Sequence, residues 1–387
     1  MDLRGIERAW RLAWMRIIAR LLPGPRIATL PDVERRPLKV LFLRYERIGD
    51  MIMATSLIRA LARSSPLVTL DVVAAPNSRP VLERNPYVRR VHALNRKSWR
   101  SYRTLARQLA DEKYDVIVDG RLNNPPIFTS TPILMWRAGA RYRVGVSGGN
   151  NDLVYNVRVK AYDRRTHYME GSKALAEPFG VDVAAADWRP EIFLSDHERD
   201  SANVVWTGAA ERVARCTAVE GFAGPRLLVN LSASEHKRRW ADDNFVTVLQ
   251  RARAVHPAMP IVVMGLPAEW DSVQAVAASV NGEAASTPQL REALALVATS
   301  DRVLTPDTSI SHAASAFNKP TVVLLRRDCH PYAPWDVTGE LIFWDGDTIH
   351  GLETSAVLPA VLRLCDTAVD REATSDIDLV LQPRSAE

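Results

Sequence analysis

Short apolar runs alternate with longer amphipathic segments along most of the chain, beginning near residue 39. Residues 39–44 form the first apolar run, which predicts a strand buried on both faces. Residues 47–50 predict a turn, and residues 51–64 predict a helix because their apolar side chains recur at helical spacing. Strand, turn and helix in this order predict one βα unit.

The alternation continues in two series, separated by the Gly- and Pro-containing stretch at residues 221–225. The first series has predicted strands at 68–73, 115–119 and 142–146 and predicted helices at 99–111 and 133–138. The second has predicted strands at 227–231, 260–265, 302–305 and 321–325 and predicted helices at 242–254, 290–298 and 309–317. This order predicts α/β domains with doubly wound parallel sheets, in which ligands bind at the carboxyl ends of the strands. We therefore predict two domains, at residues 38–220 and 221–387.

Residues 1–37 precede the first domain and begin with a predicted amphipathic helix, followed by a Pro-punctuated linker. Its apolar positions share one face, which comprises Leu3, Ile6, Trp10, Ala13, Trp14, Ile17 and Leu21. Arginines off that face suit an anionic membrane surface, but the same pattern fits a helix packed on the protein's own body. Because Arg16 and Arg20 interrupt the apolar run, we predict neither a transmembrane span nor a signal peptide.

Composition and charge narrow the class of protein. The chain has 387 residues, of which 47% are hydrophobic and 25% charged, as expected of a globular protein with two domains. Residues 1–39 hold nine Lys or Arg and four Asp or Glu, which equals the whole net charge of +5. The folded domains are therefore balanced in charge, which argues against nucleic-acid binding. Three widely spaced cysteines, Cys216, Cys329 and Cys365, favour a reducing compartment, and we predict a cytoplasmic location.

Two familiar phosphate-binding motifs are missing from the sequence. No GxGxxG follows the first predicted strand, and no GxxxxGK[ST] occurs anywhere. This weakens the case for a dinucleotide-binding enzyme or a P-loop nucleotide hydrolase.

Four local patterns occur in a fixed order instead. They are Arg-Ile-Gly-Asp at 47–50, Arg-Arg-Trp-Ala-Asp-Asp-Asn-Phe at 238–245, Gly-Leu-Pro-Ala-Glu at 265–269 and Asp-Thr-Ser-Ile-Ser-His at 307–312. With them the chain resembles glycosyltransferase family 9, the lipopolysaccharide heptosyltransferase family, over roughly residues 38 to 330. The resemblance implies a GT-B fold, in which two Rossmann-like domains face a cleft. It also implies inverting, metal-free transfer of heptose from ADP-heptose to the core of lipopolysaccharide.

Asp50 is the candidate catalytic base. Inverting sugar transfer needs one carboxylate to remove the proton of the acceptor hydroxyl as its oxygen attacks the anomeric carbon. From the residues alone, Asp50 is equally well explained as the cap of the following helix. The resemblance favours the base, because family members carry a Gly-Asp at this point.

The other patterns suggest how a nucleotide diphosphate would bind. Arg238, with Lys237 and Arg239 beside it, would stabilise the charge that grows on the leaving group, although a basic turn is often only a solvated surface. The helix that starts near residue 308 presents free amides to phosphate, and a capped helix with an interior histidine is the plainer alternative. The remaining donor candidates are Ser234, Glu269, Asp307, Thr308, Ser309 and His312. Ser309 stands where the family has a glycine, and this departure leaves the donor's identity open.

The acceptor is less well defined by the sequence. Arg121, Asn123 and Asn124 follow a predicted strand end in the first half, where acceptors of the family bind. We expect a lipid-linked or lipopolysaccharide glycan as the acceptor, at the inner face of the inner membrane, and no metal. Two alternatives stay open at this point, namely a nucleotide-sugar epimerase of the same fold and a non-catalytic, membrane-associated sugar-binding protein.

Overall fold

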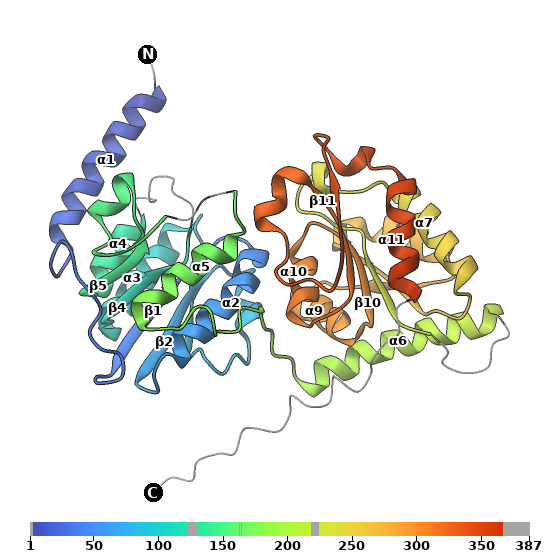
Figure 1. The fold of residues 1–387 in the computed structure, drawn as a ribbon, viewed down its shortest axis with the longest axis horizontal. Helices are drawn as coiled ribbons and strands as arrows, with labels where there is room; N and C mark the ends of the chain where they lie inside the picture. The colour runs from blue at the N-terminus through green and yellow to red at the C-terminus, as the bar shows by residue number, and fades with distance from the viewer. Residues whose placement is uncertain (1–2, 123–129, 162, 164, 218–223, 367–387) are drawn as a thin grey trace, which may run out of the picture.

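Two six-stranded parallel sheets form the body of the molecule (Figure 1). The computed structural model describes residues 3–122, 130–161, 163, 165–217 and 224–366. In the first sheet the strand order is β3-β2-β1-β4-β5-β6, and in the second it is β12-β11-β10-β7-β8-β9. The strands are β1 (Leu38–Leu43), β2 (Val68–Ala74), β3 (Arg90–Ala93), β4 (Val116–Asp119), β5 (Tyr142–Val146), β6 (Val157–Val159), β7 (Leu227–Asn230), β8 (Ile261–Gly265), β9 (Glu283–Ser286), β10 (Arg302–Pro306), β11 (Thr321–Arg326) and β12 (Gly339–Trp344). The predicted α/β class with parallel sheets is confirmed.

Helices cover both faces of each sheet (Figure 1). They are α1 (Leu3–Leu21), α2 (Ile48–Arg63), α3 (Trp99–Glu112), α4 (Ser130–Ala138), α5 (Tyr168–Ala176), α6 (Asp196–Thr217), α7 (Asp242–Val255), α8 (Trp270–Ser279), α9 (Leu290–Thr299), α10 (Ser309–Ala316) and α11 (Thr354–Asp366). The prediction of a turn at residues 47–50 is wrong, because α2 already begins at Ile48. The Asp50 carboxylate accepts a hydrogen bond of 3.4 Å from the backbone N–H of Arg47, and this bond closes the first turn of the helix.

The side chains of β1 explain why helices are needed on both sides. Val40 and Phe42 pack toward α2, whereas Leu41 and Leu43 pack toward α3 and α4. All four side chains are completely buried, so residues 40–43 form an unbroken apolar run, as the sequence pattern predicts. The cluster that holds Val40 and Phe42 continues into the second half, where α10 packs against α2.

The segment between the two sheets connects them through polar contacts. Arg291 of α9 donates hydrogen bonds to the carbonyl oxygens of Pro80 (3.1 Å) and Phe193 (2.7 Å) and forms an ion pair of 2.6 Å with Glu198 of α6. It therefore joins the first half, the connecting segment and the second half. By packing, α6 goes with α9 and β9 of the second sheet, whereas the predicted boundary after residue 220 assigns it to the first domain.

The predicted N-terminal helix is present as α1, and the side chains that it buries do not belong to the predicted apolar face. Met15 and Ile18 of the helix and Leu22, directly after it, are buried, and Met15 and Leu22 join the cluster beneath α4. On the face predicted to be apolar, Trp10, Ala13, Trp14, Ile17 and Leu21 are exposed, and the side chains of Leu3 and Ile6 lie outside the described part. Among the described helices, none is both long and apolar enough to cross a membrane.

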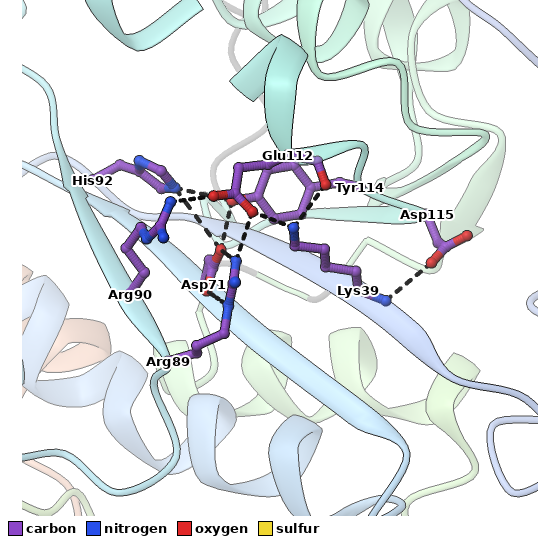
Figure 2. Close-up of polar contacts among 8 residues, drawn as sticks. All are labelled: Lys39, Asp71, Arg89, Arg90, His92, Glu112, Tyr114 and Asp115. Carbon is purple, nitrogen blue, oxygen red and sulfur yellow. Dashed lines mark hydrogen bonds and ion pairs between the residues drawn. The ribbon is translucent and has the colours of Figure 1, made fainter. Parts of the chain in front are cut away.

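A polar network connects the amino ends of β1, β3 and β4 (Figure 2). Asp71 of β2 is fully buried and accepts hydrogen bonds from Arg89 Nε (2.9 Å) and the Tyr114 hydroxyl (2.6 Å). Glu112, at the end of α3, pairs with Lys39, Arg89 and Arg90. The two basic groups Lys39 and Arg89 lower the pKa of Glu112 to about 2. This network stabilises the end of the sheet that lies away from Asp50.

Candidate functional site

Asp50 lies in the first turn of α2, directly beyond the carboxyl end of β1. Its Oδ1 atom is 3.1 Å from Nη2 of Arg44, a buried residue that also donates a 2.8 Å hydrogen bond to the carbonyl oxygen of Gly120. The guanidinium of Arg44 stacks 5.0 Å from the centre of the Tyr168 ring. Burial opposes the charge on Arg44, but Tyr168, Asp50 and Glu46 outweigh that effect and raise its pKa. A fixed cation therefore orients the carboxylate of the predicted base.

Glu46 continues this row of charges toward the predicted acceptor residue Arg121. Its two carboxylate oxygens lie 3.8 Å from Arg44 Nε and 3.7 Å from Arg121 Nε. Within the described part of the chain, neither oxygen has a hydrogen-bond partner. Burial raises the pKa of Glu46, against the opposing effect of the two arginines. The sequence patterns do not indicate Arg44 or Glu46; their position one and three residues after β1 is the only signal.

Arg121 follows β4 and is held by neighbouring side chains. It donates hydrogen bonds to Asp119 Oδ1 (2.8 Å) and Thr131 Oγ1 (2.9 Å), and its guanidinium lies 5.5 Å from the centre of the Tyr45 ring. The structure thus places Arg121 on the same side of the first sheet as Asp50. The other two predicted acceptor residues, Asn123 and Asn124, lie outside the described residues.

In the second half, Arg239 follows β7 and Glu269 follows β8, and the two side chains form an ion pair. Arg239 Nε is 3.2 Å from Glu269 Oε1, and Arg239 Nη2 is 2.8 Å from Asp242. The hydroxyl of Ser232 donates to Glu269 and accepts a 2.5 Å hydrogen bond from the backbone N–H of Leu266. These contacts tie the basic turn after β7 to the short helix η5 (Pro267–Glu269).

Arg238 points to the start of α10 instead. Its Nη1 atom is 3.1 Å from Oδ2 of Asp307, a buried residue that follows β10. The neighbouring Lys237 is exposed and pairs with Glu235 at 3.1 Å, and Ser234 is also exposed. Glu235 in turn lies 3.5 Å from Arg47, which belongs to the first half of the chain. Arg238 therefore reaches the start of α10, and Glu235, the partner of Lys237, reaches Arg47 at the start of α2.

The beginning of α10 is capped by a side chain, as one of the two interpretations of the sequence predicts. Thr308 is the cap residue, and its hydroxyl accepts hydrogen bonds from the N–H of Ile310 (3.2 Å) and from Asn230 Nδ2 (3.3 Å). Ser309 is the first residue of the helix and is half-buried. The amide of Ser311 donates a 3.2 Å hydrogen bond to the carbonyl oxygen of Thr308, so of the amides in the first turn only that of Ser309 has no partner within the helix.

His312 brings the two groups of residues together. A Cβ atom added to Gly49 would lie 2.7 Å from His312 Cδ2 and 3.1 Å from Nε2, so Gly49, adjacent to Asp50, directly faces this ring. Burial lowers the pKa of His312, although Asp307 and Asp50 oppose the shift, and the ring is neutral at pH 7. Within the described residues its Nδ1 atom has no hydrogen-bond partner. The base candidate and the donor candidates thus meet where α2 packs on α10.

A second histidine, which the sequence patterns do not indicate, lies beside this contact. His167, directly before α5, is hydrogen-bonded through Nε2 to the carbonyl oxygen of Ala333 (2.8 Å), and its ring centre is 4.8 Å from that of Trp335. The electrostatic effect of His167 reaches His312 and lowers the pKa of that residue further. No three His, Cys, Asp or Glu side chains among the described residues are grouped to hold a metal ion.

Known proteins resemble this chain over most of its length. A family model described as "Glycosyltransferase family 9 (heptosyltransferase)" matches residues 102–335. The lipopolysaccharide heptosyltransferase 2 of Escherichia coli (strain K12) is 26% identical over 312 residues, which span 77% of this chain and 85% of that protein.

Two solved structures show the same fold. A glycosyltransferase family 9 protein from Veillonella parvula superimposes with a TM-score of 0.73 at 16% identity and covers 87% of this chain and 99% of its own. The E. coli heptosyltransferase WaaC with ADP-2-deoxy-2-fluoro heptose superimposes with a TM-score of 0.65 at 16% identity. The match covers 84% of this chain and 99% of the WaaC chain. The expected GT-B fold is therefore confirmed. Because the family model matches more than half of the chain, the protein belongs to glycosyltransferase family 9, the heptosyltransferase family, and is a glycosyltransferase.

Proposed function

We propose that the protein transfers heptose, with inversion, from ADP-heptose to the core of lipopolysaccharide or a similar lipid-linked glycan, without a metal ion. The observation that carries this proposal is the meeting of Asp50 with the donor candidates across the contact of Gly49 with His312. The relative from E. coli is a lipopolysaccharide heptosyltransferase, and the WaaC structure holds an ADP-heptose analogue. Both support the choice of sugar and donor.

On the acceptor side, Asp50 would accept the proton of the attacking hydroxyl. The oxygen would then form the new bond to the anomeric carbon from the face opposite the diphosphate, which gives inversion. Arg44, at 3.1 Å, holds the carboxylate in one orientation, and Glu46 and Arg121 extend the charged surface on which acceptor hydroxyls or acidic groups would bind. Arg121, with Asn123 and Asn124, is proposed to contact the acceptor.

On the donor side, the bond from the anomeric carbon to the diphosphate oxygen breaks, and negative charge grows on ADP. Arg238, the amide of Ser309 and the positive end of the α10 dipole would stabilise this charge. Arg238 now pairs with Asp307, so phosphate would share this arginine with the carboxylate or take its place. We propose that Lys237, Arg239, Ser234 and Ser309 contact the diphosphate, that Glu269 and Thr308 contact donor hydroxyls, and that His312 borders the sugar.

The guanidinium of Arg238, held by Asp307 at the proposed donor site, supports the proposal of metal-free catalysis, since it would supply the positive charge that Mg²⁺ provides in other transferases. The reaction would take place in the cytoplasm, at the inner face of the inner membrane, where a lipid-linked acceptor is accessible. We further propose that residues 38–220 bind the acceptor and residues 221–387 the donor.

The donor can be identified by thermal shift with a panel of nucleotide sugars in EDTA. ADP-heptose at a concentration one hundred times its Kd should stabilise the protein by about 2.7 kcal/mol. UDP- and GDP-sugars should give smaller shifts. A larger shift with a UDP-sugar than with ADP-heptose would contradict the proposed donor.

A further inference from the structure

The pair of helices α1 and α4 carries apolar side chains on two sides, of which only one is packed. The buried side consists of Met15 of α1 and Leu22 directly after it, with Leu134, Met135 and Ala138 of α4. The exposed side, which we call the outer apolar face, consists of Trp10, Trp14, Ile17, Leu21, Ile133 and Trp136. Because a soluble helix normally buries its apolar stripe, a second exposed stripe requires an explanation.

The exposure of these side chains is large. Trp10 is 62% exposed, Ile17 48% and Leu21 52%, and on α4 Ile133 and Trp136 are 39% and 38% exposed. Trp10 and Trp14 touch only edge to face, with ring centres 5.7 Å apart. Figure 1 shows α1 beside α4 at the outer end of the first half, with its N-terminal part extending away from the body. The two helices therefore lie at the end of the molecule that is away from the second sheet (Figure 1).

The charges around this face indicate what covers it. Arg16 and Arg20 of α1 are exposed. On a helical wheel, Arg20 lies next to the stripe of Trp10, Trp14, Ile17 and Leu21, on the side away from the packed face, and Arg16 lies about 40° further from the stripe. Arg137 of α4 is exposed and its guanidinium lies 4.8 Å from the centre of the Trp136 ring. α4 contains no Asp or Glu. Tryptophan with bordering arginine suits the interface of an anionic lipid bilayer, where rings enter the headgroup region and guanidinium groups meet phosphates.

We propose that α1 and α4 together form a membrane-docking face that binds anionic lipid through this outer apolar face. The inference rests on the proposed function, because a lipid-linked acceptor requires the enzyme to approach a membrane. Its new element is α4, which the chain enters after β4 and Arg121. Docking through both helices would fix the orientation of the first half relative to the membrane. The predicted acceptor residue Arg121 donates a 2.9 Å hydrogen bond to Thr131 at the start of α4, which connects the acceptor side of the site to this helix.

The test uses the full chain and vesicles of phosphatidylethanolamine with phosphatidylglycerol in co-sedimentation. The W10S/W14S variant should lower the vesicle partition coefficient by about tenfold or more, and W136S should lower it several-fold. R16Q/R20Q should weaken binding to these vesicles and leave the weak binding to neutral phosphatidylcholine vesicles unchanged. The matched control V204S/V255S removes two exposed apolar side chains from α6 and α7 and should bind like wild type. Unchanged thermal unfolding shows that each variant is folded.

Several results would overturn the inference. The inference fails if the wild-type protein does not sediment with anionic vesicles, or if W136S binds them as tightly as the control does. It also fails if sedimentation velocity shows self-association of the wild type and W10S/W14S abolishes this self-association but not vesicle binding. The proposed function is tested separately, by turnover on a soluble core oligosaccharide, which all these variants should retain. Vesicle binding without any turnover would contradict the proposed function and still support the docking face.

Discussion

Replacing Gly49 by alanine tests the contact that joins the two halves of the candidate site. The new methyl group would lie 2.7 Å from His312 Cδ2, whereas carbon atoms normally approach to about 3.5–4.0 Å, so the ring or the helix must move by about 1 Å. Overpacking of this kind costs about 1–3 kcal/mol, offset by about 0.5–1 kcal/mol because alanine favours the helix. A shift of about 1 Å at His312 should lower kcat/KM by on the order of tenfold to a hundredfold.

The assay compares Gly49→Ala with Gly208→Ala, a matched control on α6. A Cβ at Gly208 meets only Glu283 side-chain atoms, at 3.9 Å, so this variant should be as active as wild type and as stable or slightly more stable. Steady-state kinetics and chemical denaturation are measured for both. If Gly49→Ala keeps wild-type kcat/KM and stability, the close approach of Asp50's neighbour to His312 is not part of the working site.

Further predictions address the base, the donor cation and the polar network. Asp50→Asn should leave ADP-heptose affinity nearly unchanged in calorimetry and lower turnover by about 10²-fold or more, and turnover within a few-fold of wild type would exclude Asp50 as the base. Arg238→Ala should weaken donor binding or turnover by about tenfold to a hundredfold, and wild-type activity should survive EDTA; loss in EDTA with recovery in Mg²⁺ would refute the metal-free proposal. Glu112→Gln should destabilise the protein at pH 7 more than at pH 3. The reason is that a folded-state pKa of about 2, below the ordinary 4.5, stabilises the fold above pH 4.5 and loses that effect as the pH falls toward 2. Equal losses of unfolding free energy at both pH values would contradict this.

The central strands and their helices could be predicted from the sequence because their buried positions produce apolar runs in strands and helically spaced apolar residues in helices. Residues 40–43 of β1 are all apolar since both faces of the strand are covered, and β7, β10 and β11 likewise contain apolar runs, at residues 227–229, 303–304 and 322–325. The sequence pattern does not indicate outer strands such as β9 and β12. Glu-Ala-Ala-Ser in β9 is only partly buried, and no residue of β12 is fully buried, so their composition carries little periodicity.

The site could be predicted only where local patterns mark it. Asp50, Arg238 and Thr308 stand in short motifs at strand ends, and the structure brings these strand ends to the contact between α2 and α10. Arg44 and Glu46 have no such motif, because their importance comes from partners that are distant in sequence, namely Gly120 and Tyr168 for Arg44 and Arg121 for Glu46. The buried side of α1 could not be predicted for the same reason. Burial of Met15, Ile18 and the following Leu22 depends on the position of α4, which is distant in sequence.

The most direct test of the proposed reaction is mass spectrometry of a core oligosaccharide from heptose-deficient lipopolysaccharide, incubated with the purified protein, ADP-heptose and EDTA. We predict a product heavier by one heptose residue, formed in step with release of ADP. An acceptor that stays unmodified, although the same protein binds ADP-heptose, would contradict the assignment of heptosyl transfer to this site.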